Sequence, residues 1–185
     1  MSRVGKKPIL IPQGVDVKVE GSKVAVKGPK GEASREFRPE IEIDMEGDKI
    51  SLSPQKGKEK LKLVKSLWGL TRMLIFNMIE GVSSGFEKRL EIEGIGFKAE
   101  VSGDQFVLNV GFSHPVKLRI PEGLKISVEK NVIIVSGIDK ELVGQFSAII
   151  RKTKPTEPYK GKGIKYAGEI VRRKVGKKVA ATAGK

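Results

Sequence analysis

Alternating apolar and polar positions dominate the first third of the chain. Valines alternate with charged residues over 15–19 and with lysine and alanine over 23–27, and a glycine and a serine typical of a turn separate the two runs at 21–22. Apolar residues alternate again over 41–45 and return at 50–52 after another turn. A period of two places every second side chain on one face of a strand, so this region predicts two β-hairpins, each with one buried face.

The period changes to three and four residues after Pro54. This spacing recurs at Leu61, Val64, Leu67, Trp68, Thr71, Leu74, Ile75 and Met78. It describes one face of an α-helix, which we expect to end at Gly81 in the left-handed conformation. Trp68 lies on the apolar face and is predicted to belong to the core. We expect the lysines near the helix start to be solvated: Lys56, Lys58, Lys60, Lys62 and Lys65.

The same order of elements returns from residue 86 onwards. Strand-like alternation fills most of 86–135, and helical spacing follows from Leu142 to Ile150. Asp139 is suited to cap this second helix, and Pro155 should stop it at Lys154.

Two alternative shifts align the second half of the sequence with the first. A shift of 83 residues places Gly28 on Gly111 and Ile41 on Leu124. A shift of 109 residues instead aligns 11–14 with 120–123, but it leaves the first helix without a counterpart, so we prefer 83.

These patterns predict an α+β fold of two duplicated small domains, each an antiparallel sheet with a packed helix, plus basic N- and C-terminal arms. The expected bounds are 1–82 for the first repeat with its N-terminal arm, 83–154 for the second repeat, and 155–185 for a basic loop and arm. Prolines at 8 and 12 predict an extended N-terminal segment, which either contacts a partner or frays.

Charge narrows the class of partner. The chain has 185 residues, a hydrophobic content of 38% that suffices for a core, and a formal net charge of +14. Twelve of its 36 basic residues lie within 151–185, beside only two acids. Such an excess favours a polyanion, with nucleic acid ahead of an anionic membrane surface.

Several chemistries are absent from the sequence. Without cysteine, disulfides and thiolate metal sites are excluded. No apolar run is long enough to cross a bilayer, and the start does not resemble a signal peptide, so we expect a soluble cytoplasmic protein without a membrane partner. The single histidine, His114, lies in an expected turn, and Gly161–Gly163 lacks the spacing of a phosphate-binding loop. We therefore expect no enzymatic activity, metal or cofactor.

The stretch 154–166 carries the strongest functional signal. Its two prolines stiffen the chain, its two glycines permit close backbone approach, and its lysines and tyrosines suit phosphates and base or sugar faces. The basic tail beyond it is expected to be disordered when free and ordered when bound, because its charges repel one another. The predicted RNA-binding residues are Lys154, Tyr159, Lys160, Lys162, Lys165, Tyr166, Arg172, Arg173, Lys174, Lys177 and Lys178. A membrane-surface protein using the same tail and an enzyme acting on RNA are the alternatives.

Three stretches resemble the family of bacterial ribosomal protein six of the large subunit: the start at 1–15, the segment 77–86, and the signature 157–166. Thr156 and Trp68 depart from it, since proline and histidine are expected there. The resemblance implies two duplicated α+β domains, no catalysis, and binding to large-subunit ribosomal RNA near the sarcin–ricin loop and stalk base. It also implies neighbouring ribosomal proteins as partners, and we expect the isolated protein to be monomeric.

Overall fold

The computed structural model describes residues 2–55, 57 and 61–176. It divides into two compact units. The first consists of Met1–Glu87 with Ser136–Val143, and the second of Lys88–Val135 with Gly144–Lys185. The division differs from the expected bounds because a short segment after the last hairpin packs with the first unit.

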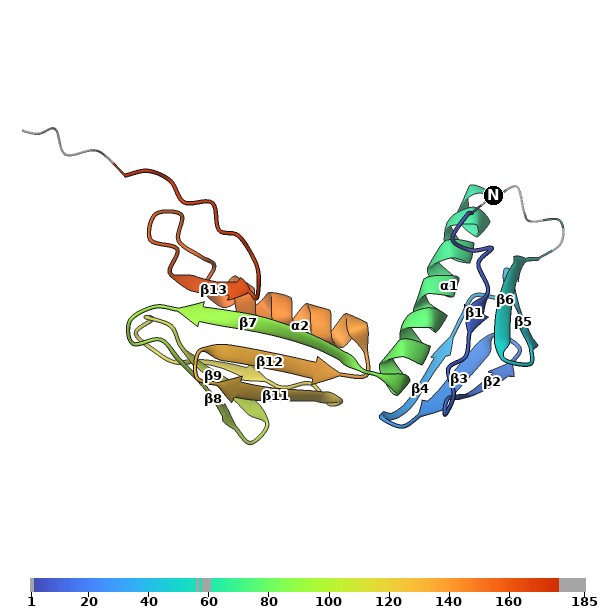
Figure 1. The fold of residues 1–185 in the computed structure, drawn as a ribbon, viewed down its shortest axis with the longest axis horizontal. Helices are drawn as coiled ribbons and strands as arrows, with labels where there is room; N and C mark the ends of the chain where they lie inside the picture. The colour runs from blue at the N-terminus through green and yellow to red at the C-terminus, as the bar shows by residue number, and fades with distance from the viewer. Residues whose placement is uncertain (1, 56, 58–60, 177–185) are drawn as a thin grey trace, which may run out of the picture. The chain divides into compact units, whose positions relative to one another are not determined.

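The first unit holds two three-stranded antiparallel sheets and one long helix (Figure 1). One sheet has the order β2-β3-β4 and the other β1-β6-β5. Helix α1 packs on β3 and β6, and the apolar faces of helix and strands meet in one core. The elements are β1 (Ile9–Leu10), β2 (Asp16–Glu20), β3 (Lys23–Gly28), β4 (Gly31–Glu36), β5 (Ile41–Glu46), β6 (Lys49–Pro54) and α1 (Lys62–Ser83).

The predicted end of α1 is wrong. The helix passes through Gly81 and ends at Ser83, and the left-handed residue is Gly85 with φ 73°. The Gly85 N–H donates to the Glu80 carbonyl at 3.1 Å, which completes the helix end. Gly81 serves another purpose, because a Cβ there would collide with the backbone carbonyl of Ile138. The glycine permits a close backbone approach rather than a turn.

The N-terminal segment is extended between its prolines, where β1 lies, as predicted, but it begins with a turn. Residues 3–6 form a turn, in which the Lys6 N–H donates to the Ser2 carbonyl at 3.4 Å. Gly5 lies so close to the Trp68 indole that a Cβ would fall 2.7 Å from the ring. The Trp68 side chain is buried, as predicted, and its Nε1–H donates to the Leu52 carbonyl at 2.8 Å. The turn therefore closes the end of the first core.

Lys62 and Lys65 near the start of α1 are exposed, in agreement with the prediction. The other three lysines of that group, Lys56, Lys58 and Lys60, lie outside the described residues.

The second unit repeats this plan with one additional strand. Its sheets have the orders β10-β9-β8 and β11-β12-β7-β13, and α2 lies along one face of the larger sheet (Figure 1). Strand β7 pairs with β12 of the last hairpin, as β1 pairs with β6 in the first unit. Alternation alone did not predict these pairings. The elements are β7 (Phe86–Glu93), β8 (Lys98–Ser102), β9 (Gln105–Asn109), β10 (Val116–Arg119), β11 (Leu124–Glu129), β12 (Val132–Gly137), α2 (Lys140–Thr153) and β13 (Gly163–Tyr166).

Both predicted ends of α2 are confirmed. The Asp139 carboxylate accepts the Glu141 N–H at 2.7 Å, which caps the first turn. The helix ends at Thr153, before the Lys154–Pro155 pair. Its apolar face reaches the sheet through Phe146, whose ring meets Phe106 edge-on with centroids 6.5 Å apart. The predicted duplicated α+β fold is thus confirmed.

Candidate nucleic-acid interface

The basic stretch 154–166, which we call the knuckle, is a closed structure rather than a free loop. The Glu157 N–H donates to the Lys162 carbonyl at 2.8 Å, and the Gly161 N–H donates to the Glu157 carbonyl at 2.9 Å. The Ile164 N–H then donates to the Lys154 carbonyl at 2.8 Å. These bonds fold the chain back on itself, so the lysines between them project from a constrained backbone.

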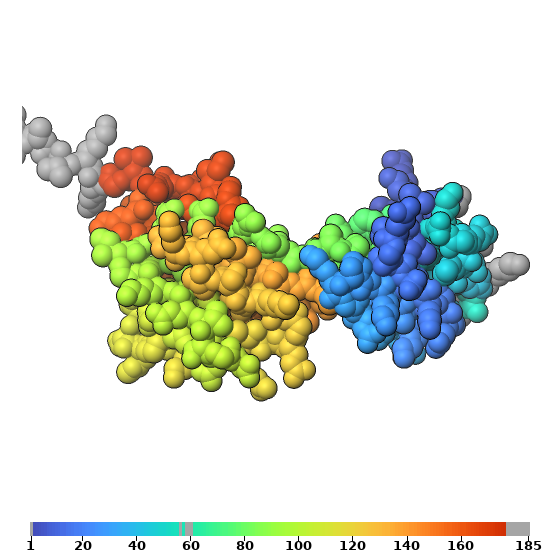
Figure 2. Space-filling view, turned by 60° about the horizontal axis from the view of Figure 1, so that its bottom comes forward, coloured from blue at the N-terminus to red at the C-terminus, as the bar shows by residue number. Residues whose placement is uncertain are grey.

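Strand β13 fixes the knuckle to the second unit. It pairs antiparallel with β7, with Ile164 opposite Ile92, and the Ile164 side chain is fully buried. The stretch expected to stand apart as a loop and arm therefore completes a sheet and adds to the core. Figure 2 shows the red C-terminal segment lying directly against the atoms of this unit.

Two glycines make the fold of the knuckle possible. Gly161 has φ 72° and Gly163 has φ 140°, both in the region that glycine favours. A Cβ at Gly163 would lie 2.6 Å from the Pro155 carbonyl oxygen. The sequence predicted close backbone approach here, and the surface approached is the chain's own.

Lys165, one of the predicted phosphate contacts, has partners within the protein. Its Nζ lies 2.5 Å from Glu93 Oε1 and 3.2 Å from Glu91 Oε2. The hydrogen bond to Glu93, followed by that to Glu91, raises the pKa of Lys165, and the same bond lowers the pKa of Glu93. Its side chain is only 18% exposed, so Lys165 holds β13 against β7.

Tyr166 is similarly committed to its own unit. The Arg151 guanidinium lies 5.6 Å and the Lys88 ammonium 5.8 Å from the ring centroid. Arg151 also binds the Glu169 carboxylate through two hydrogen bonds of 3.1 and 2.5 Å, which lowers the pKa of Glu169 and raises that of Arg151. The Tyr166 N–H donates to the same carboxylate at 3.1 Å. These contacts make Tyr166 an anchor for the end of β13.

The other predicted residues are presented to solvent. Tyr159 is 56% exposed at the tip of the knuckle, and Lys160 beside it is exposed. Lys162 is partly exposed, and Lys154 places its Nζ 4.8 Å from the centroid of the Phe112 ring. Arg172, Arg173 and Lys174 are exposed on the tail.

The tail runs back along the knuckle. The Lys174 N–H donates to the Pro158 carbonyl at 2.8 Å, and a Cβ on Gly161 would lie 2.9 Å from Arg173 Nε. The fold therefore places Arg173 and Lys174 next to the knuckle segment that carries Tyr159, Lys160 and Lys162, and we call this region the basic surface. Lys177 and Lys178 lie outside the described residues.

Sequence reasoning did not find the acidic anchors Glu91, Glu93 and Glu169, nor the cation Arg151 as an anchor. Glu91 and Glu93 of β7 alternate with Leu90 and Ile92, which is the ordinary pattern of a half-buried strand. Only the pairing of β13 with β7 shows which lysine they meet.

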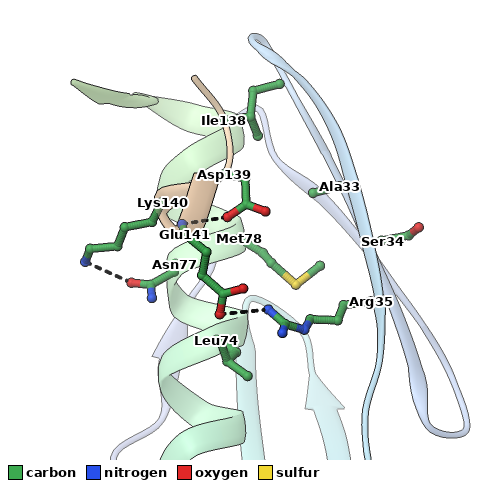
Figure 3. A pocket seen from close by; sticks show the side chains of 10 residues that line it. All are labelled: Ala33, Ser34, Arg35, Leu74, Asn77, Met78, Ile138, Asp139, Lys140 and Glu141. Atoms are coloured by element: carbon green, nitrogen blue, oxygen red, sulfur yellow. Dashed lines mark hydrogen bonds and ion pairs between the residues drawn. The ribbon is translucent and has the colours of Figure 1, made fainter. Parts of the chain in front are cut away.

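A small cavity in the first unit offers little room for a substrate (Figure 3). Its volume is about 90 Å3, well below the several hundred Å3 typical of ligand pockets. Figure 3 shows its polar groups bonded to one another: Arg35 to Glu141 at 3.3 Å, and Lys140 to Asn77 at 3.1 Å. His114 lies elsewhere, in an exposed bend between β9 and β10.

Within the part of the chain that the structure describes, the acidic residues and His114 form no group of three that could hold a metal ion. None of the helices in that part has the length and apolar character needed to cross a membrane.

Two stretches of the chain match one known protein family. Residues 11–85 and 93–167 each match the family described as Ribosomal protein L6. The starts of these stretches agree with a repeat of about 83 residues and disagree with a shift of 109.

Individual relatives match over nearly the full length. The large ribosomal subunit protein uL6 of Carboxydothermus hydrogenoformans is 55% identical over 179 residues, which cover 96% of each chain. That of Dictyoglomus turgidum is 54% identical, covering 96% of this chain and 98% of the relative. That of Trichormus variabilis is 50% identical over 96% of each chain. With two repeats of one family in tandem and full-length relatives at this identity, the chain belongs to the Ribosomal protein L6 family.

Proposed function

We propose that this chain is a structural constituent of the large ribosomal subunit in the cytoplasm, and that it binds large-subunit ribosomal RNA through the knuckle and the tail. The observation that carries the proposal is the basic surface itself. Exposed cations and one exposed tyrosine stand on a backbone that the protein's own hydrogen bonds and carboxylates hold in place.

In this proposal some residues of the knuckle and tail contact RNA, and others hold the knuckle in place. Lys160, Lys162 and the tail cations Arg172, Arg173 and Lys174 bind phosphates, with Lys177 and Lys178 of the predicted set continuing the tail. Tyr159 packs its exposed ring on a sugar or base. Lys165 and Tyr166 contribute indirectly by holding β13. Since lysine and arginine contacts to phosphate carry little sequence information, specificity comes from the shape of the folded RNA.

We also propose where on the large subunit the chain lies. Similarity to the family supports a position near the sarcin–ricin loop and the stalk base, beside other ribosomal proteins. A structural role there needs no cofactor and no catalysis, and it accounts for a chain whose most basic surface is rigidly supported.

The test is a charge-removal series on the full chain. We expect the triple variant Lys160→Gln, Lys162→Gln, Lys174→Gln to bind the large-subunit ribosomal RNA at least tenfold more weakly than the unaltered chain. Its plot of log affinity against log salt should be shallower by about 2, because three phosphate contacts are lost at roughly 0.7 to 0.9 each. Filter binding at several salt concentrations measures both quantities.

The matched control removes three exposed lysines elsewhere, as Lys18→Gln, Lys98→Gln, Lys117→Gln, with the same change in net charge. We expect this control to keep most of the affinity and a slope close to that of the unaltered chain. Equal losses in the two triple variants would show that binding follows net charge alone and would contradict a defined surface.

A further inference from the structure

Three segments far apart in sequence meet at one end of the second unit. The turn 94–97 follows β7, the bend 111–115 joins β9 to β10, and Lys154 begins the knuckle. Phe97 links the first two, because its ring lies where a Cβ on Gly94 would be 2.5 Å away and a Cβ on Gly111 would be 3.2 Å away. Glycine at these two positions lets both loops close around one aromatic ring.

These loops expose large apolar side chains that the core does not use. Ile95 is 89% exposed and Phe112 is 50% exposed. A single exposed apolar residue is ordinary, but two on adjoining loops beside a basic surface are typical of a contact site.

Lys154 connects this apolar patch to the knuckle. Its Nζ lies 4.8 Å from the Phe112 centroid, within the range of a cation–π interaction. The contact places a positive charge over the ring, on the residue that directly precedes the knuckle's first proline.

The chemistry of the loops favours a nucleobase over a protein. The sequences of 94–97 and 111–115 contain no acidic residue, and Ser113 and His114, which follow Phe112 in the chain, carry hydrogen-bonding groups. An aromatic face flanked by cations attracts a phosphate-bearing chain and stacks its bases.

We propose that Phe112, with Lys154 over the ring and the exposed Ile95 on the adjoining loop, is a stacking platform for an unpaired base of the bound RNA. The proposal rests on the proposed function and extends it, since it names a second contact of a different kind from the phosphate-binding knuckle. The platform supplies stacking that is independent of salt, whereas the knuckle supplies the salt-dependent part.

The experiment compares substitutions at Phe112 in the full chain, using large-subunit ribosomal RNA and a single-stranded adenosine hexaribonucleotide as probes. Phe112→Ala should weaken binding of both about tenfold, because stacking on an aromatic ring is lost. Phe112→Trp should bind at least as well as phenylalanine. Phe112→Leu should bind nearly as poorly as alanine, since leucine is apolar but not planar. Val101→Ala, at another exposed apolar side chain of the unit, is the control and should bind unchanged.

Two readouts separate this platform from the knuckle. Phe112→Ala should leave the salt slope unchanged, whereas the lysine triple variant lowers it. In Phe112→Trp the added indole should be quenched by the hexanucleotide, while the single natural tryptophan, Trp68, is buried in the first unit.

If Phe112→Ala binds both probes as well as the unaltered chain, the platform is refuted while RNA binding by the knuckle stands. Full binding by Phe112→Leu would also refute it, because a general apolar contact, as to a protein, would then suffice. If the unaltered chain binds neither probe, the proposed function fails together with the platform.

Discussion

At the scale of single residues, side chains of one type have opposite roles within the knuckle. Lys160 is exposed at its tip, whereas Lys165, five residues later, is held between two carboxylates. The two tyrosines divide in the same way, with Tyr159 exposed and Tyr166 placed between two cations. The residue type gives the charge or ring, but the strand pairing decides whether that group faces solvent or the protein.

The glycine at position 163 is the most restrictive of these residues. We expect Gly163→Ala to destabilise the protein by about 2 kcal/mol or more, because it adds backbone strain at positive φ and a clash with the Pro155 carbonyl. Chemical denaturation measures the free energy of unfolding.

The control for this change is Gly103→Ala, which also has positive φ, at 57°, but has open space around its Cβ position. It should cost only the backbone term of about 1 kcal/mol. If both variants lose the same stability, the close approach to Pro155 is unimportant.

At the scale of elements, β13 links the fold to the proposed function. Its backbone pairs with β7, its Ile164 side chain fills the core, and the ion pairs Lys165–Glu93 and Arg151–Glu169 lie at its C-terminal end. The glutamates of those pairs, Glu93 and Glu169, have pKa values lowered below the ordinary 4.5 by Lys165 and Arg151 respectively. The strand thus positions the knuckle and is itself sensitive to protonation of its partners.

The direction of this pH dependence follows from the sign of the shifts. A carboxyl with a lowered folded pKa contributes stability above its unfolded pKa, near 4.5, and the contribution is lost as pH falls through the folded value. We expect Glu93→Gln, Glu169→Gln to melt at a lower temperature than the unaltered chain at about pH 7, and the difference to shrink towards zero at about pH 3.

Thermal melting followed by circular dichroism over this range measures the difference. The control is Glu42→Gln, Glu122→Gln, at two exposed glutamates for which no ion pair is seen among the described residues. This control should show no comparable pH-dependent gap. A constant gap between the first variant and the unaltered chain at every pH would rule out the ion pairs as its cause.

At the scale of the whole molecule, a duplicated fold carries one specialised end. Both units use a crossing strand, a three-stranded meander, a hairpin and a helix, but only the second continues into β13, the knuckle and the tail. That continuation holds most of the chain's excess positive charge, and the proposed RNA contacts lie there.

Assembly tests the molecule as a whole. We expect a tagged copy expressed in a bacterium to sediment with the large ribosomal subunit through a sucrose gradient. The triple variant Lys160→Gln, Lys162→Gln, Lys174→Gln should be depleted from that fraction several-fold relative to the Lys18, Lys98, Lys117 control, because its phosphate contacts are lost. Sedimentation of the unaltered protein apart from both subunits would refute a ribosomal role.

The amino-acid sequence alone determined the class of most elements and the duplication, although it did not predict β13. Periods of two and three to four residues depend only on which side chains prefer water, so the hairpins, the helices and the buried Trp68 were predictable. Local chemistry likewise placed the Asp139 cap and the Pro155 stop, and the charge count indicated a polyanionic partner.

The tertiary structure alone decided which strands pair and which charges remain free to bind. Pairing of β13 with β7 joins residues more than seventy positions apart, so no local pattern distinguishes Lys165 from Lys160. In the same way, residue type does not distinguish Gly81 from Gly85. In the structure Gly81 lies inside the helix, against the Ile138 backbone, and Gly85 follows the helix end. Contacts between distant segments depend on the path of the whole backbone, and that path is absent from the spacing of neighbouring residues.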